Sequence, residues 1–140
     1  MRSLAILVLA LLAAPARAAE IGAGHWEMDI VTTMPGMPAG GMPIKQVQCL
    51  SAEDGKDPAK LFGSPGSGCR FTDQRDTGSA YHFRISCSAP TAVSGAGEMR
   101  YTRDTLDGQI VLDMKQQGGQ SVQTKTTIKA RRTGPCATPR

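Results

Sequence analysis

The chain has 140 residues, and its 16 basic and 12 acidic side chains give a formal net charge of only +4 at pH 7. This length suits one domain with one modest core. The weak charge argues against a nucleic-acid partner. With two histidines and no Cys-x-x-Cys spacing, the sequence also lacks the usual pattern of a zinc site.

The first 18 residues have the pattern of a cleavable signal peptide. A basic start at Arg2 is followed by an apolar run from Leu4 to Ala14, and Ala16-Arg17-Ala18 offers the small residues that a signal peptidase recognises. The run is about half the ~20 residues of a membrane-spanning helix. We therefore expect cleavage after Ala18 and a periplasmic or secreted domain over residues 19–140, with no transmembrane segment in the mature chain.

The four cysteines are expected to form two disulfides, because an even number in an oxidising compartment is typical of a disulfide framework. They are Cys49, Cys69, Cys87 and Cys136. Three pairings are possible. We favour Cys49–Cys69, which would fasten the glycine-rich segment between them, with Cys87–Cys136, which would attach the C-terminal tail to a strand.

Period-two alternation predicts the strands. Apolar residues alternate with polar ones after Gly24, and a proline- and glycine-rich connection follows Met34. Capping patterns predict one or two short helical turns between Ser51 and Phe62. The remaining expected strands cover 44–50, 71–75, 81–87, 97–102, 110–115 and 122–131, with turns at 76–79, 106–108 and 118–119 and a loop through Pro90 and Gly95.

These elements predict an all-β domain. Strands joined by short turns are antiparallel neighbours, so the second half should form a meander with one apolar and one polar face. The apolar face must be covered. We expect the sheet to curl into a small barrel, or the first strands to lie over it as the second layer of a sandwich.

The motifs, taken together, resemble the bacterial exported proteins grouped as domain-of-unknown-function family 3617. The resemblance rests on the Gly24-His25-Trp26-Glu27 start, the Met34-Pro35-Gly36-Met37-Pro38 segment, the four cysteines, the Gly95-Ala96-Gly97-Glu98 segment and the Gly134-Pro135-Cys136 end. It implies a periplasmic or secreted β domain. The family has no assigned activity, so no catalytic residue is carried over from it.

Three methionines in the first connection are candidate metal ligands. Met34, Met37 and Met42 lie within nine residues, and thioether sulfur suits the soft ion Cu(I). His25 would add a nitrogen ligand if the strand brought it near. The alternatives are a flexible apolar loop, a lid whose methionines fill gaps in the core, or a methionine-lined contact with another partner.

No arrangement of residues predicts catalysis. The Gly-x-Ser-x-Gly motif of serine hydrolases is absent, and the acid pairs Glu27/Asp29 and Asp54/Asp57 are explained by a strand and by helix caps. We therefore expect no enzyme and no other cofactor, but a binding or accessory module. Its partner would be an unknown small ligand or an envelope protein, and its oligomeric state stays open.

A basic stripe on the last strand is the remaining feature. Lys125, Lys129 and Arg131 share one predicted face. We interpret the strand as a sheet edge that the lysines protect from aggregation. The alternative is an envelope-associated structural protein that contacts lipid head groups or its own copies through this face.

Overall fold

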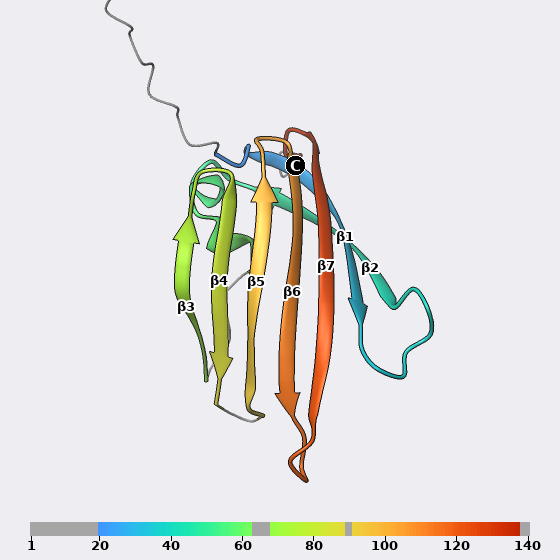
Figure 1. Ribbon diagram of the computed structural model, residues 1–140. Helices are drawn as coiled ribbons and strands as arrows, with labels where there is room; N and C mark the ends of the chain where they lie inside the picture. Colours follow the sequence, from blue (N-terminus) through green and yellow to red (C-terminus); the bar gives the residue numbers. More distant parts are fainter. Residues whose placement is uncertain (1–19, 63–67, 89–90, 138–140) are drawn as a thin grey trace, which may run out of the picture.

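The computed structural model describes residues 20–62, 68–88 and 91–137, which form one open antiparallel sheet (Figure 1). Its strands are β1 (Gly24–Thr33), β2 (Met42–Leu50), β3 (Cys69–Asp76), β4 (Ala80–Cys87), β5 (Val93–Tyr101), β6 (Thr105–Lys115) and β7 (Ser121–Gly134). Two 3-10 turns, η1 (Asp54–Lys56) and η2 (Pro58–Phe62), connect β2 to β3. The predicted all-β meander with short helical turns is confirmed.

The strand order is β2-β1-β7-β6-β5-β4-β3, so the first two strands extend the same sheet beyond β7. They curve away from the plane of β4 to β7, and the end of β2 and the 3-10 turns lie behind the main strands (Figure 1). The cover predicted for the apolar face thus comes from curling within one sheet. Because β2 and β3 remain the two edges, the sheet does not close into a barrel.

The core lies at the end of the sheet where β1 begins and β2 ends. Trp26, Leu50 and Met99 are 1–2% exposed, and they pack with a cluster of other buried side chains. This cluster also contains Ile21, Tyr81, Phe83, Tyr101, Leu106 and Ala130. Directly paired residues share a face, and the register places Met99 on the same concave side as Tyr81 of the next strand.

The disulfide pairing differs from the favoured one. All four cysteines are bonded, as Cys49–Cys136 and Cys69–Cys87. Cys69 and Cys87 are directly opposite in the β3–β4 ladder. Cys49 is paired with His25 of β1, whose other neighbour is Gly134, so the chain after β7 crosses β1 to reach β2. Strand adjacency, which the sequence did not reveal, therefore decides the pairing.

Two predicted irregular segments are strand. Gly95 belongs to β5 and Gly108 to β6, and the β5–β6 turn lies earlier, where the amide of Thr102 donates to the carbonyl of Thr105. A Cβ on Gly108 would lie 2.6 Å from Cγ of Met99. This glycine leaves room for the core methionine and does not mark a turn. The predicted turn at Gly118-Gly119 is confirmed, and both residues have positive φ.

Candidate functional site

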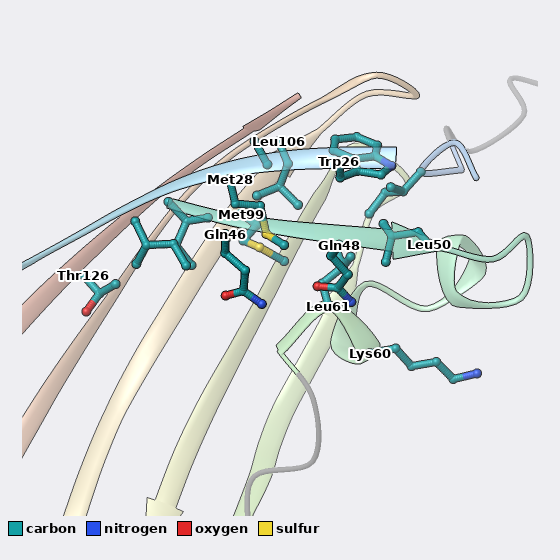
Figure 2. Close-up of a pocket in the computed structure, with 14 residues that line it drawn as sticks. Trp26, Met28, Gln46, Gln48, Leu50, Lys60, Leu61, Met99, Leu106 and Thr126 are labelled. Carbon is teal, nitrogen blue, oxygen red and sulfur yellow. The ribbon is translucent and has the colours of Figure 1, made fainter. Parts of the chain in front are cut away.

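A hollow of about 510 Å³ lies between the curled first strands and the concave face of the main sheet (Figure 2). Its size falls in the range of small-molecule sites. The first strands, η2 and strands β5 to β7 all contribute to its wall. The lining residues are Ile21, Trp26, Met28, Ile30, Gln46, Gln48, Leu50, Lys60, Leu61, Met99, Leu106, Thr126, Ile128 and Ala130.

The inner end of the hollow is apolar and rigidly packed. Trp26 is 2% exposed, and its indole N–H donates to the carbonyl of Gly22 at 2.9 Å, which holds the ring in place. Met99 and Leu106 complete this end. No buried side-chain nitrogen or oxygen in the described residues lacks a hydrogen bond. Nothing polar at the inner end therefore requires water, which favours an apolar occupant.

The outer rim is polar and comes from β2 and η2. Ile30 of β1 is paired with Ile44, so the inward positions of β2 continue through Gln46 and Gln48 to Leu50. Figure 2 shows both glutamine side chains leaving the same side of β2. Within the described residues neither carboxamide has a hydrogen-bond partner. Two carboxamides, each with donors and an acceptor, thus interrupt an otherwise apolar side of β2.

Lys60 carries the only charged side chain among the described residues that line the hollow. Its side chain is exposed, and its ammonium end points away from the hollow (Figure 2). The nearest acids are occupied locally: the pKa of Asp54 is lowered mainly by the hydrogen bond from the Ser51 hydroxyl, with a smaller contribution from Lys60. Glu53 forms an ion pair with Lys56 at 2.8 Å. No ion pair within the described residues holds the Lys60 ammonium.

The sequence reasoning missed this site, although a signal was present. Gln46 and Gln48 occupy successive inward positions between Ile44 and Leu50 on one predicted strand. Polar residues on a core-facing side are more informative than exposed apolar ones. Their significance required knowing that the strand curls over the sheet, which the alternation pattern does not contain.

Two of the three predicted copper ligands lie in the β1–β2 connection, and the third begins β2. Met34 and Met37 are half-buried and share a turn in which the Met37 amide donates to the Met34 carbonyl at 3.2 Å. Met42 begins β2 and is 53% exposed. His25 is at the opposite end of β1, about 30 Å along the strand from Met34. The strand therefore does not bring His25 near these methionines.

The candidate catalytic acids have structural partners. Glu27 accepts from Arg131 at 3.2 Å, Asp29 pairs with Lys45 at 3.2 Å, and Asp57 caps η2 by accepting from the Ala59 amide. The His25 ring lies 2.7 Å from the Thr133 hydroxyl. No group of three histidine, cysteine, aspartate or glutamate side chains in the described residues is placed to hold a metal ion.

The basic stripe lies on a central strand, because β7 is paired on both sides with β1 and β6. The interpretation of this strand as a protected sheet edge is therefore wrong. On the convex face, acids are interleaved with the bases: Asp29 and Asp107 are the two cross-strand neighbours of Lys129. Opposite charges at directly paired positions stabilise a sheet, which gives these lysines a structural role.

Two tyrosines close the core beside the hollow. The Tyr101 hydroxyl donates to Asp76 at 2.5 Å, and the Tyr81 hydroxyl donates to Gln74 at 2.6 Å. Burial raises the pKa of both phenols, and for Tyr101 the hydrogen bond to Asp76 adds to the effect. The Tyr101 contact ties β3 to β5, and the Tyr81 contact ties β3 to β4, so both attach the edge strand β3 to the sheet.

The chain belongs to a family described as proteins of unknown function, DUF3617. The family model matches residues 21–136, which include every strand and both disulfides. No curated protein and no solved structure matches the chain. The resemblance inferred from the motifs is thereby confirmed at the level of the family.

The predicted signal peptide, residues 1–18, lies outside the described residues. No helix in the described residues, the two 3-10 turns included, is long and apolar enough to cross a membrane.

Proposed function

We propose that this protein is an exported, non-enzymatic binding module that holds a small apolar ligand in the hollow between the curled first strands and the main sheet. The observation that carries the proposal is the hollow itself. Of its 14 lining residues, ten are apolar, and they enclose a volume in the range of small-molecule sites. An apolar ligand would gain roughly 25 cal/mol for each Å² of apolar surface removed from water.

Export is supported by the signal-peptide pattern of residues 1–18 and by the two disulfides, which persist in oxidising compartments. A non-enzymatic role is supported by the partners of the candidate acids, since Glu27 and Asp29 are engaged in ion pairs on the convex face. The hollow lies on the opposite, concave face.

The single tryptophan provides the assay. Trp26 lines the hollow, so its fluorescence reports occupancy without a label. We expect a bromine-labelled alkanol such as 11-bromoundecanol to quench this fluorescence saturably, because bromine quenches on contact, while undecanol competes without quenching. If no bromoalkanol of eight to fourteen carbons quenches saturably, the hollow does not bind apolar chains and the proposal is wrong.

Two neighbouring residues form a matched pair of variants. Ile30 lines the hollow, whereas Val31 points to the convex face, where it is paired with Thr127. We expect Ile30→Glu to weaken bromoundecanol binding by about tenfold or more, since a charge placed among apolar groups opposes burial of the chain. Val31→Glu should leave binding unchanged. Equal effects of the two variants would mean that the ligand binds outside the hollow. Urea unfolding of both variants checks that they fold.

A second candidate function is Cu(I) binding by Met34, Met37 and Met42. The observation that favours it is the turn joining Met34 and Met37, which brings these two residues close together. Titration with Cu(I) against a competing chelator tests the idea. The expected result is binding that is lost when all three methionines are replaced by leucine; affinity that survives the replacement rules these ligands out.

A further inference from the structure

The polar rim of the hollow consists of Gln46, Gln48 and Lys60, and these residues indicate what kind of apolar ligand the hollow accepts. The positions of β2 on the side of the hollow run Ile44, Gln46, Gln48 and Leu50, and because Gln46 is exposed and Gln48 half-buried, the two carboxamides stand at the open rim of the wall. Replacing them with leucine would bury more apolar surface.

The rim offers hydrogen-bond donors and positive charge. Each glutamine has an NH₂ group with two donors beside one acceptor oxygen, and Lys60 has an ammonium with three donors and no acceptor. None of these three side chains makes a hydrogen bond or ion pair within the described residues. No carboxylate of the described residues lines the hollow. The rim is therefore matched to a group rich in acceptor oxygens that carries negative charge.

The geometry places this rim beside the apolar interior. Gln46 and Gln48 are two residues apart on one face of β2, about 7 Å along the strand, so two oxygens of one head group can reach both amides. The Lys60 stem lines the hollow while its ammonium lies toward solvent (Figure 2). This arrangement allows an apolar tail to fill the interior while a charged head stays at the mouth, partly hydrated.

We propose that the ligand is a single-chain amphiphile with an anionic oxygen-rich head, whose tail fills the hollow and whose head is held by Gln46 and Gln48. The exposed Lys60 side chain would turn from solvent toward the mouth to contact the head. This inference rests on the proposed function of the hollow. A carboxylate and a phosphate monoester share the required chemistry, so a free fatty acid and a phosphate-headed lipid with one chain are the two sources that an experiment must separate.

The test compares amphiphiles of equal chain length, each below the concentration at which it forms micelles. Competition against bromoundecanol, followed by Trp26 fluorescence, is measured for dodecanoate, dodecyl phosphate, dodecanol and dodecyltrimethylammonium. We expect one or both anions to bind more tightly than dodecanol, and the cation to bind most weakly. The tighter anion identifies the head. Equal affinities for all four would overturn the inference while leaving the hollow as an apolar site, whereas absence of all binding would overturn the proposed function as well.

Variants locate the head group. Lys60→Glu should weaken the anion by about fivefold or more without changing dodecanol, because it reverses an interaction of the size of an exposed ion pair. Lys45→Glu, which changes the same charge on the convex side of β2, is the matched control and should leave both affinities unchanged. An equal loss in the two variants would mean that only overall charge matters, which overturns the assignment to Lys60.

The glutamines give a readout that loss of folding cannot imitate. Replacing Gln46 and Gln48 together by leucine should weaken the anion and tighten dodecanol, because donors are lost while apolar surface is gained. A change of both affinities in the same direction would show that the carboxamides do not contact the head.

Discussion

Removing the Cys49–Cys136 bond should destabilise the protein more than removing the Cys69–Cys87 bond. The paired cysteines are 87 and 18 positions apart, respectively. In the chain-entropy model, cross-links of these lengths stabilise the folded state at 25 °C by about 4.6 and about 3.2 kcal/mol, a difference of about 1.4 kcal/mol. The two bonds also differ in place: the longer one ties β2 to the end of β7, whereas the shorter one joins neighbouring strands.

The assay is urea unfolding of the double variants Cys49→Ser/Cys136→Ser and Cys69→Ser/Cys87→Ser, followed by Trp26 fluorescence. The first should have the lower free energy of unfolding. A thiol count on the denatured proteins provides a control for connectivity: each variant should contain no free thiol, while Cys49→Ser/Cys69→Ser should contain two unless they re-pair. A larger loss from the Cys69–Cys87 variant would refute the entropic reasoning, and free thiols in the first two variants would refute the pairing itself.

Two further measurements test the core. Gly97→Ala should cost about 1–3 kcal/mol of stability, because its Cβ would lie 2.3 Å from the ring of Phe83, whereas Gly134→Ala, which meets nothing within 4 Å, should be nearly neutral in the same urea assay. The raised pKa values of Tyr81 and Tyr101 predict that the folded protein shows less phenolate absorbance at 295 nm at pH 10 than the urea-unfolded chain, whose tyrosines titrate near 10.0. Stability should then decline as the pH rises above 10, since the unfolded state loses these protons first; normal titration of both phenols in the folded protein would contradict the burial described here.

The proposal for the hollow depends on long-range placement that no local pattern encodes. Gln46 and Lys60 belong to different elements, and only the curl of β2 over the sheet brings them to one rim with Ile128 of β7 behind them. Each residue taken alone looks like an ordinary surface polar group or strand residue. The sequence offered the two inward glutamines as a clue, but their meaning depends on which surface they face.

The errors in the strand assignments have a similar cause. A glycine such as Gly108 signals a turn when only its backbone freedom is considered, yet here it is a strand residue that accommodates Met99 of the neighbouring strand. The basic residues of β7 were interpreted as protecting a sheet edge because the sequence does not show that β7 pairs with β1. Both errors concern strand neighbours: Gly108 and Met99 belong to one hairpin, whereas β1 and β7 are distant in sequence.

What the sequence by itself determined is the local part: the all-β class, most strands and their inward faces, the two short helical turns, the involvement of all four cysteines in disulfides, and the family. These follow from period-two alternation, turn residues and composition, which are short-range properties. Only the tertiary structure decided the disulfide partners, the central place of β7 and the hollow beneath β2. Strand order and curvature arise from packing between residues far apart in the chain. A single sequence does not show which of those residues contact one another.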